Sequence, residues 1–189
     1  MLQRYLTIAV LTLTTVVSSN LISTSIPVFA APVKQVTQTV KQDFAKYPAN
    51  SIYKGKPATL KPENQEQKDY LPEIQSVIGQ GANFAGHYVI VGALNHAMGG
   101  TSTAAIADLK TGKIYLPSQL KPYHDQRGAG YAPPRPDGGL HYQANSNLLV
   151  VTGRAGGNDG NKGIGHYYYK WQNNKLTFIK FVASPYQSQ

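Results

Sequence analysis

The sequence predicts a mainly β domain of the α+β class: two antiparallel three-stranded meanders packed as a small sandwich or propeller-like unit, with one N-terminal helix. Two observations predict this class. After Gly81, short runs of β-branched and aromatic residues alternate with glycine- and asparagine-rich turns. The order strand, glycine-rich loop, strand, tight turn, strand also occurs twice, in residues 86–116 and 148–182. Ordinary hairpin patterns could produce the same similarity, so a true duplication stays open.

Each element has its own justification. The helix is predicted over Asp69–Ile78, because Asp69 can cap its first turn, an apolar face follows and Gly79 or Gly81 can end it. Asn173-Asn174 is expected to form a tight hairpin turn, since Asn tolerates the positive φ that such turns need. The predicted strands are Gly86–Gly92, Thr103–Leu109, Lys113–Leu116, Leu148–Thr152, Gly165–Trp171 and Leu176–Val182.

Residues 1–30 are predicted to be a signal peptide. Arg4 supplies a positive start, Leu6–Val17 is apolar, and Ala30 ends a region with residues acceptable to a signal peptidase. The twelve residues of that apolar stretch would span only about 18 Å as a helix, against about 30 Å of hydrocarbon. The mature chain is therefore expected to begin at Ala31, without a transmembrane anchor, and to be exported to the periplasm or the medium.

The rest of the chain is expected to consist of a linker and one domain. Residues 31–63 are rich in Lys, Gln, Thr and Pro and are predicted to be a basic linker that can hold one short helix. Residues 64–189 are predicted to be a single β-rich domain. Loss of Arg4 with the signal peptide lowers the formal net charge from +9 to +8, which favours an anionic envelope component or an acidic protein as partner. Nucleic acid is not expected as a partner of an exported protein.

Composition excludes several kinds of site. The chain contains no Cys, which excludes disulfides, thiolate zinc sites, iron–sulfur clusters and a Cys nucleophile. The sequence has no Gly-x-Ser-x-Gly elbow, no phosphate-binding Lys-Ser/Thr loop and no His-Glu-x-x-His motif. No cofactor is expected.

Three histidines are each followed by a tyrosine: His87, His141 and His166. Because strand side chains alternate between faces, each pair should send His one way and Tyr the other. If the three strands are neighbours in compatible register, three imidazoles could share one face and bind zinc or copper. Separate structural histidines are the favoured alternative.

A ligand site is predicted where two loops should meet. Ala93–Gly100 and Gly153–Gly165 occupy equivalent places in the two meanders, so they should open on the same edge. Glycine backbone there would let a ligand approach closely. The side chains expected to gather at this edge are His96, Arg154, Asn158 and Asp159.

Two passages, Asn83–Ile90 and Ile106–Ile114, resemble a group of small uncharacterised exported bacterial proteins. The group is recognised by a Phe-Ala-Gly-His-Tyr strand, a glycine-rich loop that often carries two Cys, and an Asp-x-x-Thr-Gly hairpin. The resemblance covers roughly residues 70–182. This chain departs from the pattern at Ala93–Gly100, which has no Cys. The resemblance implies export and a compact β domain, and it implies no catalytic residue.

The function expected from these observations is that of an exported, soluble, β-rich binding or envelope-associated protein. The first alternative is a small hydrolase, metal-dependent or not, that would use His87, His141 or His166 with Asp125 or Asp159. The second is a secreted inhibitor, because the Pro- and Gly-rich segment 118–140 is long enough to insert into another protein.

Overall fold

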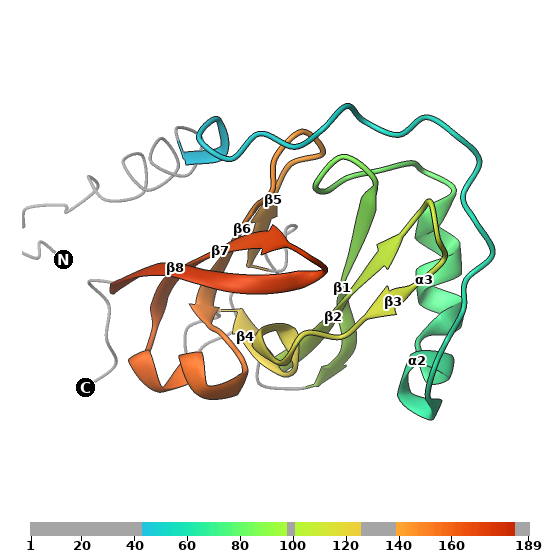
Figure 1. The fold of residues 1–189 in the computed structure, drawn as a ribbon. Helices are drawn as coiled ribbons and strands as arrows, with labels where there is room; N and C mark the ends of the chain where they lie inside the picture. Colours follow the sequence, from blue (N-terminus) through green and yellow to red (C-terminus); the bar gives the residue numbers. More distant parts are fainter. Residues whose placement is uncertain (1–42, 98–100, 126–138, 184–189) are drawn as a thin grey trace, which may run out of the picture.

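A computed structural model describes residues 43–97, 101–125 and 139–183 (Figure 1). Among these residues no helix is long and apolar enough to cross a membrane. In chain order the elements are α2 (Gln65–Asp69), α3 (Leu71–Ile78), β1 (Tyr88–Ala97), β2 (Thr101–Asp108), β3 (Ile114–Tyr115), η1 (Ser118–Leu120), β4 (Tyr123–Asp125), β5 (Leu140–Tyr142), β6 (Leu148–Arg154), η2 (Gly157–Lys162), β7 (Gly165–Gln172) and β8 (Lys175–Ala183).

The eight strands form one antiparallel sheet that does not close, in the order β1-β2-β4-β6-β7-β8. β3 pairs with β2, and β5 pairs with β6. The mainly β class and both predicted meanders, β1-β2-β3 and β6-β7-β8, are present. The expected sandwich of two separate meanders is wrong, because β4 pairs with both β2 and β6 and joins the two units edge to edge.

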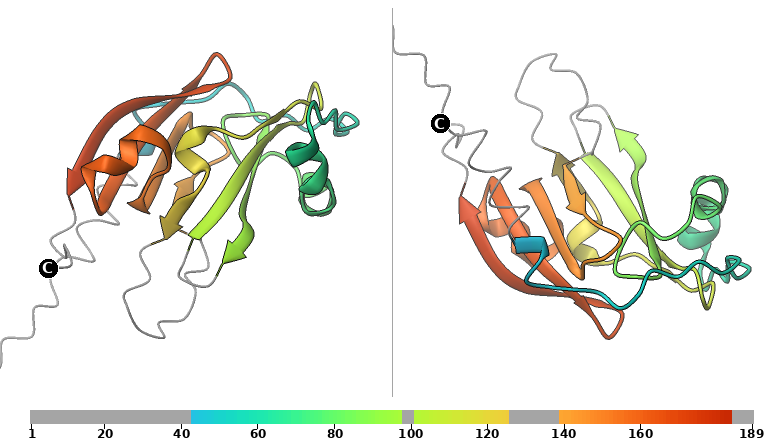
Figure 2. Two further views of the ribbon diagram at one scale, coloured as in Figure 1. Left: turned by 90° about the horizontal axis from the view of Figure 1, so that it is seen from below. Right: turned by 90° about the horizontal axis from the view of Figure 1, so that it is seen from above.

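The inner face of the sheet holds the larger core, which includes Phe84, Tyr123, Tyr167 and Tyr169. The sheet curves strongly around this core (Figure 2), so side chains from β1 and β7 contact each other across it. The ring centroids of Tyr88, at the start of β1, and Trp171 of β7 lie 5.3 Å apart, and the rings pack edge to face. This curvature buries large aromatic side chains without a second sheet.

Two separate elements cover the outer face of the sheet. α3 covers β1 and β2, and its Ile74 is fully buried against them. Residues near the N-terminal end of the described chain cover β6 and β7: Phe44 packs with Leu148, Val150 and Tyr168. The site described below lies on the same outer face, where β6 continues beyond Val150 toward Arg154.

Residues 43–62, here called the strap, run along the molecule from β6 to α2 (Figure 1). The strap is held mainly through its backbone. Ser146 Oγ donates to the carbonyls of Phe44 and Tyr47, Ala58 N donates to the Leu109 carbonyl, and Lys61 N donates to the Gly112 carbonyl. Packing in the described chain therefore begins at Asp43, so the strap, which the sequence places in the expected linker, packs on the sheet.

Several predicted elements have different limits in the structure. The expected helix Asp69–Ile78 is two short helices that meet at Tyr70, with Asn64 capping α2 and Pro72 in the first turn of α3. Residues 93–97 extend β1 instead of forming a loop, and bulges accommodate them. The Asn173-Asn174 turn is confirmed, with both residues at positive φ.

Candidate functional site

The outer face of β6 changes from apolar to polar along the strand. Leu148 and Val150 lie beneath Phe44 of the strap. Thr152 occupies the next outer position and is 5 % exposed. Arg154, two residues further on, is exposed. The end of β6 is therefore the part of this face where polar side chains can meet a ligand.

Two imidazoles contact the Thr152 hydroxyl from the neighbouring strands. His141 of β5 places Nε2 2.9 Å from Thr152 Oγ1, and His166 of β7 places Nδ1 3.0 Å from the same oxygen. Both histidines are half-buried. The sheet register produces this cluster. Thr152 pairs directly with His166. His141 pairs with Val150, which lies two residues before Thr152 on the same face of β6. These three residues are here called the histidine–threonine cluster.

The number of hydrogens in the cluster limits which group can donate in each hydrogen bond. A threonine hydroxyl carries one hydrogen, so it can donate to only one of the two imidazoles. The other imidazole must then donate its own N–H to Oγ1. If both rings are protonated, both donate to Oγ1 and the hydroxyl hydrogen is released toward another acceptor. Protonation of both rings would therefore add positive charge to the cluster and turn the Thr152 hydroxyl hydrogen away from the imidazoles.

The ends of four strands lie in one row beside the cluster. The register pairs Ala97 with Thr101, Thr101 with His124, and His124 with Arg154. The Thr101 hydroxyl lies 3.2 Å from His124 Nδ1. Within the described residues Arg154 has no carboxylate partner, so its guanidinium adds an unpaired positive charge at this end of the sheet.

The segment 118–140, expected as a binding or inserting loop, has both its described ends beside Thr152. Asp125 pairs with Gly153 at the first end. At the second end, Thr152 N donates to the Gly139 carbonyl over 2.7 Å. Residues 126–138 lie outside the described chain. The cluster thus lies next to both described ends of the segment that the sequence predicts to be a binding or inserting loop.

The four residues predicted to share a ligand site are only partly placed together. Arg154 lies at the expected end of the sheet, where the described parts of both loops begin. Asn158 is exposed on η2. Asp159 accepts a hydrogen bond from Tyr169, an inner-face residue, and lies 3.5 Å from Lys162. The backbone of His96 belongs to β1, while its side chain lies outside the described part.

Among the described residues no three His, Asp or Glu side chains are placed to hold one metal ion. His141 and His166 share the outer face as their His-Tyr pairs predicted, with Tyr142 and Tyr167 packed on the inner side. His87 does not join them, because it precedes β1 and lies beside Asp108 instead. The described residues therefore do not form the expected three-imidazole site.

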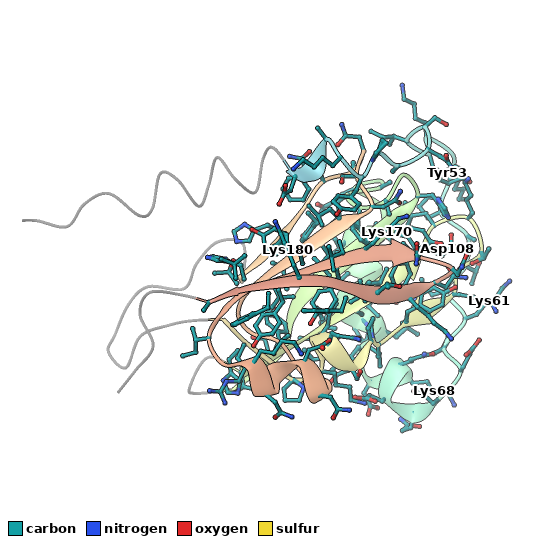
Figure 3. All side chains as sticks on the ribbon, turned by 60° about the vertical axis from the view of Figure 1, so that its left-hand side comes forward. Tyr53, Lys61, Lys68, Asp108, Lys170 and Lys180 are labelled. Atoms are coloured by element: carbon teal, nitrogen blue, oxygen red, sulfur yellow. The ribbon has the colours of Figure 1, made fainter. Side chains whose placement is uncertain are left out.

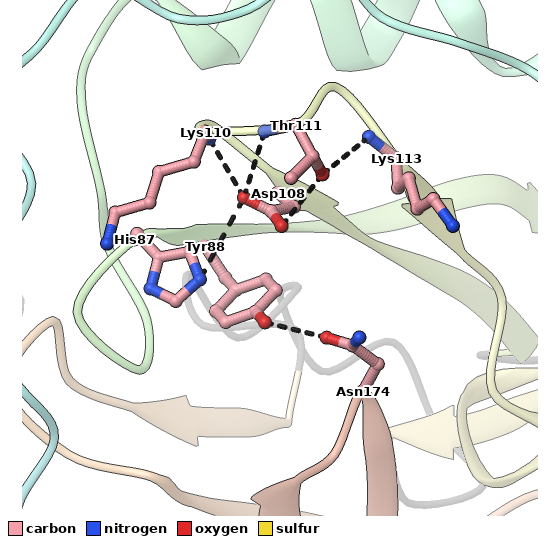
Figure 4. A network of polar contacts seen from close by, with 7 residues as sticks. All are labelled: His87, Tyr88, Asp108, Lys110, Thr111, Lys113 and Asn174. Atoms are coloured by element: carbon pink, nitrogen blue, oxygen red, sulfur yellow. Dashed lines mark hydrogen bonds and ion pairs between the residues drawn. The ribbon is translucent and has the colours of Figure 1, made fainter.

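The surroundings of His87 are structural (Figure 4). Asp108 is buried and accepts hydrogen bonds from Lys110 N, Thr111 N and the Thr111 hydroxyl, which closes the turn after β2. His87 Nε2 lies 3.9 Å from Asp108. Burial lowers the pKa of His87, and the Lys110 charge lowers it too, whereas the Asp108 charge opposes both.

Stability should therefore depend on pH through His87. Because its folded pKa lies below the ordinary value of 6.5, the unfolded chain takes up a proton that the folded chain resists. This contribution to stability is present above pH 6.5 and is lost as the pH falls through the folded pKa. Urea denaturation between neutral pH and about pH 5 should show a shallower loss of stability for His87→Gln than for the unaltered chain. Equal slopes would contradict this assignment.

Thr152 and His124 were not among the site residues predicted from the sequence. Thr152 lies within an apolar strand, where a threonine is an ordinary residue. The one signal is that Thr152 is polar, whereas the two preceding residues on the outer face of β6, Leu148 and Val150, are apolar. Basic side chains elsewhere are spread over the molecule, with Lys170 and Lys180 near β7 and β8 and Lys61 and Lys68 at the end that holds α2 (Figure 3).

In comparisons with known proteins, no family model, no curated protein and no solved structure matches the chain.

Proposed function

We propose that this chain is a binding protein for anionic polymers, exported from the cell, and that it binds phosphate or carboxylate groups at the histidine–threonine cluster and Arg154. The contact of two imidazoles with one buried hydroxyl carries the proposal. Most outer-face positions covered by the strap and α3 are apolar. Among the described residues, polar side chains gather instead where β5, β6 and β7 meet around Thr152.

The donor types at the cluster suit an oxyanion. Imidazolium N–H and guanidinium groups form charge-assisted hydrogen bonds to phosphate and carboxylate oxygens. Thr152 is held from both sides, so its hydroxyl is oriented before a ligand arrives. Arg154 brings a charge that no described carboxylate neutralises.

The charge of the whole chain supports the same ligand class. The formal charge is +9 in the full sequence and +8 after the proposed loss of Arg4, and either charge raises the local concentration of anionic polymers and speeds their association. Export is proposed from the N-terminal sequence, and the resemblance to small exported proteins points the same way. A basic protein that is exported would meet the anionic polymers of the cell envelope, so such a polymer is the partner we propose.

A binding assay with matched variants tests the proposal. The probes are polyphosphate and polyglutamate, which separate phosphate from carboxylate recognition, with neutral dextran as the blank. Arg154→Ala should weaken binding of the preferred polymer by about tenfold or more, as expected for loss of one charge-assisted hydrogen bond. Lys113→Ala removes the same charge from an exposed position elsewhere and should change affinity less than about twofold.

The histidines predict a pH dependence for the same interaction. Protonation of either imidazole adds a positive charge and an N–H donor beside the bound anion, so affinity should rise as the pH falls. A variant with His141→Gln and His166→Gln should lose this rise. If Arg154→Ala and the double variant bind as Lys113→Ala does at neutral and at acidic pH, the cluster is not the binding site.

A further inference from the structure

A groove beside the β7–β8 turn is separate from the histidine–threonine cluster. Its volume is about 420 Å³, within the range of small-molecule sites. Its walls come from three parts of the chain: the start of α2, the segment from β3 to η1, and the β7–β8 turn. The lining residues are Glu63, Gln67, Ile114, Tyr115, Leu116, Pro117, Gln119, Asn174, Lys175 and Leu176.

The walls of the groove are fixed by contacts behind them. Gln67 is buried and joins two walls, because its Oε1 accepts from Glu63 N and its Nε2 donates to the Ile114 carbonyl. Asn174 is held by the Tyr88 hydroxyl, which donates to its Oδ1 over 2.7 Å. These bonds preorganise the groove, so a ligand would not have to order it.

One aromatic ring lines the groove. Tyr115 is half-buried, and its ring packs edge to face on Trp171, with centroids 5.5 Å apart. Burial raises the pKa of the Tyr115 hydroxyl, and nearby charges, including that of Glu63, raise it further. By contrast, Tyr167, Tyr168, Tyr169 and Trp171 are buried. Tyr115 is thus the ring in this region that a ligand can reach.

The groove also carries polar groups without partners. Within the described part of the chain, the side chains of Glu63, Gln119 and Lys175 form no hydrogen bond, and neither does Asn174 Nδ2. One carboxylate and one ammonium give the groove no net charge, although the chain as a whole is strongly basic. A neutral ligand with many hydroxyl or amide groups matches this set.

From this combination we infer that the groove binds a neutral oligosaccharide. A sugar ring has an apolar C–H face that can lie on Tyr115 and Pro117, and hydroxyls around its edge that can pair with amides and a carboxylate. A charged polymer fits the groove poorly, since its single-sign charge would meet both Glu63 and Lys175. This inference does not rest on the anion site proposed above.

The β7–β8 turn provides a matched pair of variants. Asn173 and Asn174 both have positive φ, so glycine is tolerated by the backbone at either position. Only Asn174 lines the groove. Asn174→Gly removes the groove amide, whereas Asn173→Gly alters the same turn outside the groove. Gln119→Ala removes a second amide, and its side chain has no described hydrogen-bond partner.

Calorimetric and NMR titrations with three probes test the inference: a tetramer of N-acetylglucosamine, a tetramer of glucose and tetra-alanine. We expect one of the two sugars to bind with a Kd of about 1 mM or tighter. Asn174→Gly and Gln119→Ala should each weaken that binding about fivefold, and Asn173→Gly should not. Urea unfolding of each variant checks that it is folded. Binding of tetra-alanine alone, binding that Asn173→Gly weakens equally, or no saturable sugar binding would overturn the inference.

Discussion

Replacing Phe44 by Ala should destabilise the domain by about 3 kcal/mol. Phe44 is 5 % exposed and packs on Leu148, Val150 and Tyr168, although the sequence places it in an expected linker. Removing the ring loses the free energy of its burial and leaves a cavity under the strap. Urea denaturation of the mature-length chain, monitored by circular dichroism, measures the effect.

Ile52→Ala provides the control within the same strap. Ile52 is 43 % exposed, so its substitution should change stability by less than about 0.5 kcal/mol. If Phe44→Ala is as mild as Ile52→Ala, the strap does not contribute to the core, and the domain begins near residue 64 after all.

Gly112→Ala should cost about 2–4 kcal/mol, because two effects act together. Gly112 has a φ of 77°, in the left-handed region that side chains disfavour. A Cβ at this position would overlap the Thr59 carbonyl oxygen of the strap. Either the strap or the turn after β2 must move to accommodate the methyl group. Thermal or urea unfolding would record the loss.

Gly79→Ala is the matched control for that substitution. Gly79 ends α3 with helical backbone angles, and no other atom lies within 4 Å of the place that its Cβ would take. Its substitution should be neutral or slightly stabilising, by less than about 1 kcal/mol. Equal costs at both glycines would show that contact with the strap does not constrain Gly112.

The parts of the fold that local patterns determine could be predicted from the sequence. The β class, the two meanders and the Asn173-Asn174 turn follow from strand alternation and turn residues. The opposite placement of His and Tyr at 141–142 and 166–167 follows from the two-residue period of strands. These features need no knowledge of distant contacts.

The parts that depend on distant contacts could not be predicted. β4 has three residues, Tyr123–Asp125, in a Pro- and Gly-rich segment, so no alternation reveals that it joins the meanders. The strap is held largely by backbone hydrogen bonds, which leave little trace in residue type. Thr152 gains its role only because the register places His141 and His166 beside it.

The most direct test of the proposed function is an NMR titration that follows the imidazole rings of the cluster. Protein labelled with ¹⁵N in its histidine rings is titrated with polyphosphate and, separately, with polyglutamate. We expect the ring signals of His141 and His166 to shift with one saturable curve, while those of His87, beside Asp108, stay in place. Thr152→Val should abolish or strongly weaken this response in a protein that remains folded. Saturable polymer binding that leaves the His141 and His166 signals unchanged would show that the polymer binds elsewhere on the protein.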